Sequence, residues 1–367
     1  MQVPKLFSPG PVMVRDDVRQ SLLHYDVCHR GAEFEAMFGD TQDRIRKLLR
    51  ADERYFPVII SGSGTSANEA VLSSLFNEGD AVMLVHNGLF GERLLEIIQK
   101  YDIPLVDARF EWAKYPDMNV IEKLIEENPA IKVVAMVYHE TSTGMINPVR
   151  EVGRLCRKTG KLFFTDAVSA VGAQNVFVED DNIDIVTSVG GKCIGAYPGS
   201  AFVCMRDDVF KSITTAQCKN VYLSLYKHYQ SAVLNCQTPN TPNITLFWAL
   251  NKALKNIEEE GLENRVAGRE RCAAIIRDGA RALGLRLLLA DHMASTVTSM
   301  FAPDGVDALQ FLDEMERRGY VLYIGKGKYK DQGMFQVATM GEISEDDCRA
   351  FLAEMKDCLE EMKPAAK

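Results

Sequence analysis

The sequence predicts an α/β protein with a large, mainly parallel sheet domain followed by a smaller α+β domain. The chain has 367 residues, more than one small hydrophobic core requires. From about residue 40 to 205, short apolar runs alternate with helical patterns. Such alternation is typical of parallel strands covered by helices on both faces. After residue 245 the pattern becomes mainly helical and then mixed, which indicates the second domain.

Each apolar run of the first region is short enough for a single strand. The runs fall at 58–60, 81–85, 103–106, 132–138, 161–165, 183–187 and 200–205. Ligands of parallel sheets gather at the carboxyl ends of the strands. We therefore expect the functional residues among those that directly follow these runs.

The second region begins with a helical pattern from 246 to about 283, which is interrupted near Gly261. Strands are expected at 295–301, 321–324 and 334–339, and a final helix is expected from Glu345. We assign residues 1–260 to a large domain that includes an N-terminal arm. Residues 261–367 form the predicted small C-terminal domain.

The composition excludes several function classes. A net charge of −9 disfavours nucleic-acid and anionic-membrane partners, whose phosphates would repel the chain. No apolar stretch approaches the roughly 20 residues of a membrane helix, and the first residues lack a signal-peptide pattern. The nine cysteines are scattered without CxxC pairs, which favours reduced thiols over disulfides or a metal site. We therefore expect a soluble, cytoplasmic protein without a metal centre.

Two residues at neighbouring strand ends point to a cofactor. Lys192 follows the run at 183–187 among small residues, and Asp166 ends the run at 161–165. A lysine in such a place can form a Schiff base, and an aspartate can pair with a pyridinium nitrogen. Together they predict an enzyme that uses pyridoxal phosphate (PLP).

A glycine-rich segment provides a candidate phosphate site. Ser63, Gly64 and Thr65 follow the run at 58–60 and open a helical pattern, where backbone N–H groups and the helix dipole attract a phosphate. The segment also matches the G-x-G-x-x-A fingerprint of dinucleotide sites. That fingerprint requires an acidic residue after the next strand, but His86 occupies this place. We therefore favour a monophosphate cradle.

Two further strand ends carry residues that suit a cofactor ring. Phe90, between two glycines after the run at 81–85, can stack on such a ring. Thr141, after the run at 132–138, can donate a hydrogen bond to its phenolic oxygen. Its neighbours His139 and Glu140 are alternative acid–base groups. The order of these signals along the chain is harder to dismiss than any single one.

The residues that would form this site belong to a wider pattern. It comprises Ser8-Pro9-Gly10-Pro11, Gly62-Ser63-Gly64, Asn87-Gly88, the segment from His139 to Pro148, Asp166-Ala167, Lys192-Cys193, Gly325-Lys326 and Met340-Gly341-Glu342. With this pattern the chain resembles the class V aminotransferases of fold type I, over almost its whole length. Within that family it is most similar to the 2-aminoethylphosphonate–pyruvate transaminases.

The resemblance implies roles that agree with the assignments above. Lys192 would carry the cofactor, Phe90 would stack on it where relatives have Tyr or Trp, and the larger domain would bind it. The resemblance also implies a homodimer with a shared active site, in which Thr241 would reach the phosphate of the neighbouring subunit. Ser8 and Gly10 would lie at the substrate.

One position departs from the family pattern. Where the family has an arginine that binds the acidic group of the substrate, this chain has Gln336. Glutamine cannot supply a cationic fork. We therefore expect another cation at the substrate, with Arg30, Lys326 and Lys328 as candidates, or a changed substrate.

The predicted reaction transfers the amino group of 2-aminoethylphosphonate to pyruvate, or runs in reverse. Its partners are a small amino donor and a 2-oxo acid acceptor. A serine– or alanine–glyoxylate aminotransferase is the first alternative. A PLP lyase or desulfurase is disfavoured because Gly191, and not a histidine, precedes Lys192. A non-catalytic protein on the same fold is the alternative from a different class.

Overall fold

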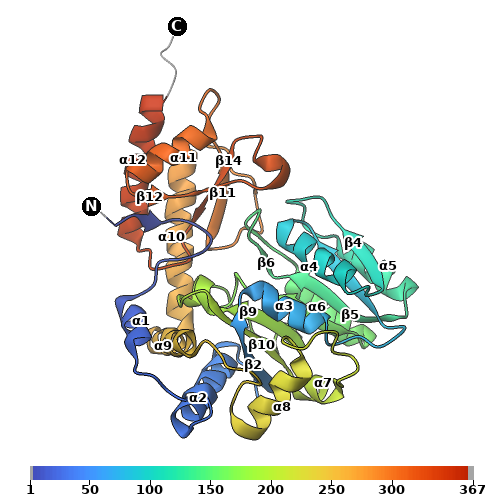
Figure 1. Ribbon diagram of the computed structural model, residues 1–367. Coiled ribbons are helices and arrows are strands. Elements are labelled where there is room, and N and C mark those ends of the chain that lie inside the picture. The colour runs from blue at the N-terminus through green and yellow to red at the C-terminus, as the bar shows by residue number, and fades with distance from the viewer. Residues whose placement is uncertain (1–2, 363–367) are drawn as a thin grey trace.

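A seven-stranded sheet forms the centre of the larger part of the molecule (Figure 1). The computed structural model describes residues 3–362. In spatial order the strands are β2 (Tyr55–Gly62), β10 (Gly199–Arg206), β9 (Ile185–Val189), β8 (Leu162–Asp166), β5 (Ile131–Val137), β3 (Ala81–His86) and β4 (Leu105–Arg109). β10 runs antiparallel to both of its neighbours, and the other pairs are parallel. The predicted α/β class is confirmed.

The crossover helices lie on opposite faces of this sheet. They are α3 (Gly64–Leu72), α4 (Leu89–Lys100), α5 (Met118–Glu127) and α6 (Val149–Thr159). The connections that contain α3 and α4 lead to strands nearer the β4 edge of the sheet. The connections that contain α5 and α6 lead back toward the β2 edge. Because such crossovers are right-handed, the two pairs cover different faces. α3 packs with α4, and α5 packs with α6.

Each predicted run of the first region coincides with a strand, and the largest difference in length is at β2. The expected strand covered 58–60, whereas β2 begins at Tyr55 and includes Pro57. β2 lies at the edge of the sheet and pairs with β10 alone. Proline is tolerated there because no strand on the outer side needs its missing N–H group.

The C-terminal part forms a second layered unit, at the top of Figure 1. Two long helices, α9 (Ile244–Glu260) and α10 (Leu262–Ala282), meet at Gly261, whose φ of +81° favours glycine. A three-stranded antiparallel sheet follows in the order β11 (Val297–Phe301), β14 (Met334–Ala338) and β13 (Tyr323–Ile324). α11 (Ala308–Arg317) packs against β13 and against α12 (Glu345–Met362), which also packs with α10 and begins where the final helix was expected.

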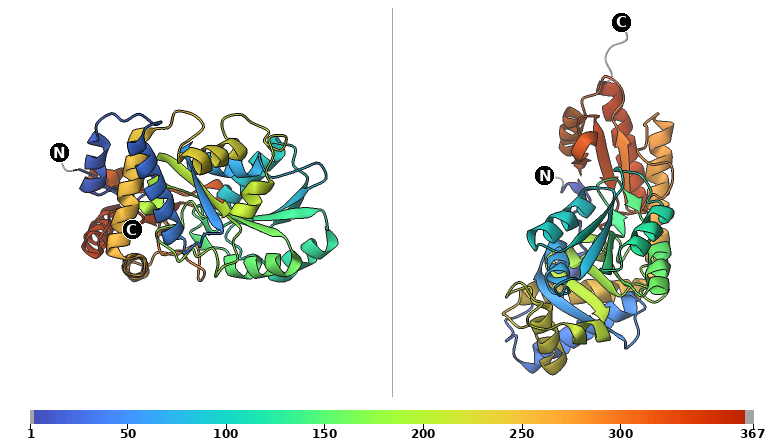
Figure 2. Two further views of the ribbon diagram at one scale, coloured as in Figure 1. Left: turned by 90° about the horizontal axis from the view of Figure 1, so that it is seen from below. Right: turned by 90° about the vertical axis from the view of Figure 1, so that its right-hand side faces the viewer.

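The N-terminal arm connects both parts. β1 (Lys5–Leu6) pairs in parallel with β12 (Tyr320–Val321), and the Phe7 ring stacks on Phe351 of α12 at 4.6 Å between centroids. The chain then crosses to the larger part, as the views of Figure 2 also show. The remaining elements are α1 (Asp16–Gln20), η1 (Ser21–Leu23), α2 (Ala32–Leu48), β6 (His139–Glu140), β7 (Met145–Ile146), η2 (Gly190–Ile194), α7 (Asp207–Ser212), α8 (Leu225–Asn235) and η3 (Gly327–Tyr329).

The buried apolar residues form two large clusters. One surrounds the seven-stranded sheet and extends from Val14 to Ile257, and the other contains Phe7 and residues from Cys272 onward. A small third cluster lies between segments of both parts and includes Val12, Cys193 and Ala338. The turn that carries Lys192 is thereby packed where the two parts meet. The domain boundary at residue 260 itself remains a prediction.

Candidate active site

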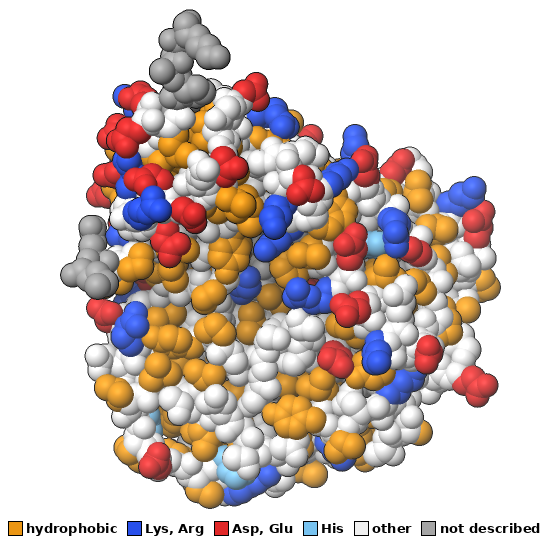
Figure 3. Space-filling view, turned by 45° about the horizontal axis from the view of Figure 1, so that its top comes forward, with side chains coloured by type: hydrophobic (Ala, Val, Ile, Leu, Met, Phe, Trp, Pro, Cys, Tyr) orange, Lys and Arg blue, Asp and Glu red, His pale blue; other side chains and the backbone are white. Residues whose placement is uncertain are grey.

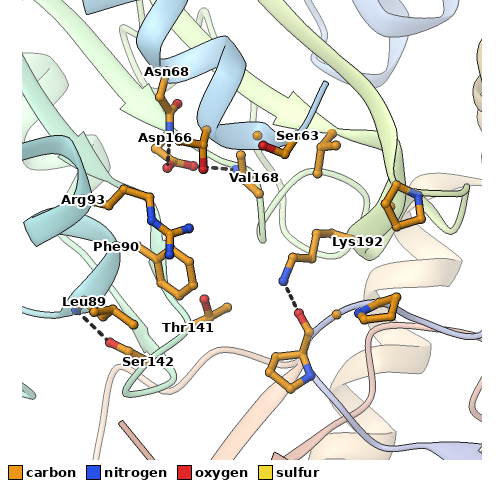
Figure 4. Close-up of a pocket in the computed structure, with 18 of the residues that line it drawn as sticks. Ser63, Asn68, Leu89, Phe90, Arg93, Thr141, Ser142, Asp166, Val168 and Lys192 are labelled. Carbon is orange, nitrogen blue, oxygen red and sulfur yellow. Dashed lines mark hydrogen bonds between the residues drawn. The ribbon is translucent and has the colours of Figure 1, made fainter. Parts of the chain in front are cut away.

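A pocket of about 440 Å³ opens at the carboxyl ends of the parallel strands. The large sheet contributes the segments after β2, β3, β5, β8 and β9, and the arm and the small sheet close the opposite side. Its lining includes Gly10, Ser63, Gly64, Thr65, Phe90, Thr141, Asp166, Lys192 and Gln336, all of which were predicted site residues. Figure 4 shows Lys192 on one side of the pocket and Asp166 and Arg93 on the other.

Lys192 lies in η2, the tight turn directly after β9. A Cβ atom at Gly191 would lie 2.7 Å from the backbone of Pro198, so the turn requires glycine there. Arg265 of α10 donates hydrogen bonds to the carbonyl oxygens of Cys193 (2.9 Å) and Gly172 (3.0 Å), which anchors the turn from outside. The Lys192 side chain crosses the pocket and donates to the carbonyl oxygen of Pro9 (Figure 4).

Burial lowers the pKa of the Lys192 ammonium, which favours the neutral, nucleophilic amine. Gly10 preserves the space beside this amine. Its φ is +133°, and a Cβ atom there would lie 2.5 Å from the Lys192 nitrogen. A side chain at this position would therefore strain the backbone and obstruct the amine.

Asp166 is the last residue of β8, and its side chain points into the pocket (Figure 4). Its carboxylate accepts hydrogen bonds from Asn68 Nδ2 at 2.6 Å and from the Val168 N–H group at 3.0 Å. Asn68 in turn accepts from the Thr187 hydroxyl at 2.5 Å, which fixes its orientation. Burial raises the pKa of Asp166, and these hydrogen bonds oppose that shift. A cationic partner at the pocket would relieve the cost of this buried charge.

The start of α3 forms the predicted anion cradle. Ser63 is the residue before the helix, and its side chain makes no capping hydrogen bond. The first N–H groups of a helix have few partners within it, and although that of Ser66 donates to the Ser63 carbonyl oxygen at 2.9 Å, those of Gly64 and Thr65 remain for an anion. A Cβ atom at Gly64 would lie 2.4 Å from Val168, so only glycine allows this close approach.

The buried carboxylate of Glu140 joins the segment that carries Phe90 to the segment that carries Thr141. The carboxylate accepts hydrogen bonds from the N–H groups of Phe90 (3.1 Å) and Gly91 (3.0 Å) at the start of α4. It also accepts from the N–H group (3.2 Å) and the hydroxyl (2.5 Å) of Ser142. Burial raises the pKa of Glu140, and these donors oppose the shift. The carboxylate thus fixes Phe90 relative to the segment that carries Thr141.

His139 has a packing role in the structure. Its Nδ1 atom lies 2.9 Å from the carbonyl oxygen of Ser169, and its side chain is buried outside the pocket. Burial lowers its pKa to about 4, so the ring is neutral at neutral pH. Neither His139 nor Glu140 lines the pocket, and neither is placed to act as its acid or base.

The pocket of the chain itself does not include the predicted residues Arg30, Ser8 and Thr241. The guanidinium of Arg30 donates to Gln237 Oε1 (2.8 Å) and to the carbonyl oxygen of Thr238 (2.7 Å). Ser8 is buried and donates to the carbonyl oxygen of Pro11 at 3.0 Å. Thr241 is exposed. Their predicted contacts with substrate or with a neighbouring subunit remain predictions.

Several pocket residues were not predicted from the sequence, among them Asn68, Arg93 and Tyr323. Asn68 lies one helical turn after Gly64, and Arg93 lies three residues after Phe90, so helical spacing could have placed both beside residues that were chosen. Tyr323 donates to the carbonyl oxygen of Gly10 at 2.7 Å. That contact joins segments 313 residues apart, for which a single sequence carries no signal.

The pocket is a local concentration of positive charge in an acidic protein. Arg93 and Lys326 line it beside Lys192, whose pKa burial lowers, and Asp166 is the carboxylate among its described lining residues. On the face seen in Figure 3, by contrast, side chains of both signs are interspersed. The excess of cations suits a ligand with several negative charges.

These features fit PLP. The site offers a lysine amine whose pKa burial lowers, a buried carboxylate for the pyridine nitrogen, an aromatic ring and a helix N-terminus for the phosphate. Among residues 3–362 no His, Cys, Asp and Glu side chains gather as a metal site would require. All nine cysteines are free thiols. Of the helices in the described part of the chain, none is both long and apolar enough to cross a membrane.

Comparison with known proteins agrees with this site. Residues 17–326 match the class V aminotransferase family. An uncharacterized aminotransferase of Methanocaldococcus jannaschii is 32% identical over 97% of this chain and 93% of its own length. The 2-aminoethylphosphonate–pyruvate transaminase of Klebsiella pneumoniae is 30% identical over 96% of this chain and 97% of its own.

A solved structure extends the similarity to the fold. The ureidoglycine–glyoxylate aminotransferase of Bacillus subtilis superimposes with a TM-score of 0.91 at 27% identity, covering 100% of this chain and 95% of that one. Fold, pocket and matches together define a PLP-dependent transaminase of fold type I. Within that class the chain belongs to the class V aminotransferase family. The non-catalytic alternative is thereby set aside.

Proposed function

We propose that this enzyme transfers the amino group of 2-aminoethylphosphonate to pyruvate, giving phosphonoacetaldehyde and alanine, or catalyses the reverse reaction. The observation that carries the proposal is the similarity to 2-aminoethylphosphonate–pyruvate transaminases along nearly the whole chain. The excess of cations in the pocket supports it, because a phosphonate bears up to two negative charges.

In the proposed mechanism, bound PLP supplies an electron sink for the negative charge that develops on the substrate carbon. Lys192 would hold the cofactor, and its amine, once free, would take the proton from the amine-bearing carbon of the donor and return it to the cofactor. Its lowered pKa favours the neutral form that this step requires. Asp166 holds the proton on the pyridine nitrogen. The hydrogen bonds from Asn68 and Val168 keep its carboxylate in place.

The remaining predicted residues bind and orient the cofactor. We propose that Ser63, Gly64 and Thr65 hold its phosphate at the start of α3, with Phe90 against its ring. Thr141 donates to its phenolic oxygen. Glu140 supports the roles of Phe90 and Thr141, because the hydrogen bonds of its buried carboxylate fix both of their segments.

Absorbance spectroscopy of the purified holoenzyme tests the donor. On addition of 2-aminoethylphosphonate without an acceptor, the band of the Lys192-bound cofactor should give way to that of its amine form. Pyruvate should then restore the first band, as ping-pong chemistry requires. A spectrum that ignores 2-aminoethylphosphonate but responds to alanine or serine would assign the enzyme a different donor.

A serine– or alanine–glyoxylate aminotransferase remains the second candidate. The close superposition on a glyoxylate-dependent aminotransferase favours it. The same spectroscopy separates the two, because glyoxylate in place of pyruvate would then restore the Lys192-bound form faster. Gln336 argues against this candidate, since a planar carboxylate is best held by an arginine fork.

We further propose that the enzyme is a cytoplasmic homodimer whose subunits share the active site. Thr241 is exposed in the single chain, as a residue that reaches a neighbouring subunit must be. Large apolar side chains are also exposed at Leu23, Val221 and Leu234, which a second copy could cover. Light scattering tests the dimer, and a monomer would contradict it. The free thiols support a reducing compartment.

A further inference from the structure

We propose that Lys326 is the residue that binds the acidic group of the substrate, in place of the arginine for which this chain has Gln336. The choice of donor rests on the proposed function, but the assignment of the subsite does not. It follows from the hydrogen bonds of Gln336, from the position of Lys326 and from the way the other candidate cations are engaged.

Gln336 is unable to bind an oxyanion in its present orientation. Its Nε2 atom donates to the carbonyl oxygen of Thr141 at 2.7 Å and to the hydroxyl oxygen of Ser299 at 2.9 Å. The carbonyl of Thr141 can only accept, so this contact fixes which end of the amide is the nitrogen. Both N–H groups are therefore engaged. What Gln336 can still offer to the pocket is an acceptor oxygen, which repels a carboxylate or phosphonate.

Lys326 brings a cation to the same end of the pocket from the neighbouring strand. Tyr323 of β13 lies directly opposite Gln336 of β14 in the small sheet, and Lys326 follows β13. Its ammonium lies 5.5 Å from the centre of the Tyr323 ring, and the Tyr323 hydroxyl binds Gly10 beside the Lys192 amine. Contacts through Tyr323 and Gly10 therefore link the Lys326 ammonium to the part of the pocket where the Lys192 amine lies.

The charge of Lys326 is not neutralised by the protein. No carboxylate of residues 3–362 lies within ion-pair distance of its ammonium. A half-buried cation that lines a cavity without a counterion is poised for an anionic ligand. Apart from the contact with the Tyr323 ring, no interaction among the described residues engages this ammonium, so ligand binding is its clearest use.

The other cations near the substrate are engaged or placed elsewhere. Arg30 is held by the segment from Gln237 to Pro239. Lys328 forms an ion pair with Glu111 at 2.8 Å and does not line the pocket. Arg93 lies over the Phe90 ring at 5.0 Å, at the end of the pocket near Asp166 (Figure 4). It therefore belongs to the cofactor side.

The loop that carries Lys326 is fixed against the larger part of the molecule. The Tyr329 hydroxyl donates to the carbonyl oxygen of Trp112 at 3.1 Å, and the Lys328–Glu111 ion pair lies beside this contact. A Cβ atom at Gly327 would lie 2.9 Å from the Trp112 ring, so the approach is close. The Tyr329 and Gly327 contacts place the backbone of Lys326 without using its ammonium, whereas the exposed Lys328–Glu111 pair contributes little.

An ammonium recognises charge rather than planar shape, because it lacks the fork of a guanidinium. Lys326 should therefore accept both the tetrahedral phosphonate of 2-aminoethylphosphonate and the carboxylate of a 2-oxo acid. It should favour a doubly charged phosphonate. This property suits an enzyme whose two substrates carry different acids.

Binding of methylphosphonate to the holoenzyme tests the assignment without any turnover. The bound cofactor occupies the phosphate cradle, so calorimetry reports the substrate subsite. Lys326→Gln should weaken binding by on the order of 10- to 100-fold, the usual range for a hydrogen bond to a charged group. Lys328→Gln is the matched control, because it removes the same charge two residues away. Its affinity should stay within about 2-fold of the unaltered enzyme.

The same variants should differ in the half-reaction with 2-aminoethylphosphonate. Lys326→Gln should raise the donor concentration for half-maximal conversion and leave the limiting rate within a few-fold, since Lys192 and Asp166 are intact. Cofactor affinity should be unchanged, which distinguishes substrate binding from a general loss of structure.

Each outcome decides one claim. Equal affinity of Lys326→Gln and the unaltered holoenzyme for methylphosphonate would overturn the assignment, as would equal losses in Lys326→Gln and Lys328→Gln. Failure of the unaltered holoenzyme to bind methylphosphonate would overturn it as well. If methylphosphonate binds through Lys326 but 2-aminoethylphosphonate fails to convert the cofactor, the subsite stands and the proposed donor falls.

Discussion

The two ends of the pocket are built from different kinds of structure. The cofactor end comes from one sheet, with Asp166 after β8, Lys192 after β9 and the cradle at the start of α3. The substrate end joins the arm to the small sheet, through contacts such as that between Gly10 and Tyr323. The sheet places its strand ends together by pairing alone. The other end depends on how separate segments pack, so its side chains can change without disturbing the chemistry.

Their charges differ in the same way. At the cofactor end the carboxylates of Asp166 and Glu140 are both satisfied by donors from neighbouring segments. At the substrate end the ammonium of Lys326 has no such partner among the described residues. A pre-formed network fixes a cofactor that stays bound, whereas an unpaired charge is available for substrates that come and go.

The largest effect is expected at Lys192, the residue of the cofactor end that is proposed to carry the chemistry. Lys192→Ala should lower the rate of both half-reactions by about 10²–10⁴-fold, the usual contribution of a positioned general base. Borohydride should fix the cofactor covalently to the unaltered protein and not to the variant, as mass spectrometry of peptides would show. Lys328→Ala, outside the pocket, is the control. A variant that transaminates near the original rate would refute the assignment.

Asp166→Asn should produce the next largest loss and two opposing changes in stability. Without the carboxylate the pyridine nitrogen loses its partner, and activity should fall by about 10²–10³-fold, as for other lost electrostatic contacts. In the protein without cofactor at neutral pH, removal of the buried charge is a gain of about 1–3 kcal/mol, but the new amide group would face Asn68 Nδ2 and lose that hydrogen bond.

The pH dependence of that gain follows from the raised pKa of Asp166. The folded protein binds this proton more tightly than the unfolded chain. Its free energy of unfolding therefore falls as pH rises from the unfolded pKa to the folded pKa. Above that interval the penalty is complete, so the stability of Asp166→Asn relative to the unaltered protein should be highest there and fall in acid. Urea unfolding of both cofactor-free proteins over this range measures it, and a stability difference that does not rise with pH would contradict the expectation.

The contrast between the two ends also explains what the sequence could predict. The strand runs and their order placed Asp166 and Lys192 at one edge of the sheet, because parallel pairing converts chain order into position. The same logic could not place Tyr323 against Gly10, since that contact depends on how the arm crosses the molecule. The departure at Gln336 was visible in the sequence. Which of three candidate cations compensates for it could be decided only from contacts in three dimensions.

Glu140→Gln should have a moderate effect, confined to the cofactor end. The neutral amide accepts more weakly, and its NH₂ group would face the N–H donors of Phe90 and Gly91. We expect the affinity for the cofactor to fall by about 10-fold and the free energy of unfolding to fall by about 1–3 kcal/mol. Fluorescence titration of the cofactor and urea unfolding measure the two effects.

Glu96→Gln is a suitable control for Glu140→Gln. Glu96 is exposed and lies on α4, the helix whose first N–H groups donate to Glu140. It should change neither quantity measurably. If Glu140→Gln lowers stability but leaves the cofactor affinity and absorbance maximum unchanged, then Glu140 is structural and does not position the ring site.

The smallest effect is expected at the substrate end, where Gln336→Arg should share the role of Lys326. A guanidinium at this position can still donate to the Thr141 carbonyl and would add a fork for a carboxylate. We expect the KM for pyruvate to fall by a few-fold, with little change in the limiting rate.

The sharper prediction concerns the combination of Gln336→Arg with Lys326→Gln. If both side chains bind the same acidic group, the loss caused by Lys326→Gln should be smaller when the arginine is present, and a double-mutant cycle on KM would give a coupling energy of about 0.5–3 kcal/mol. Gln336→Met serves as the control, because it removes the amide contacts without adding charge. Strictly additive effects would place Lys326 and position 336 at different groups of the substrate.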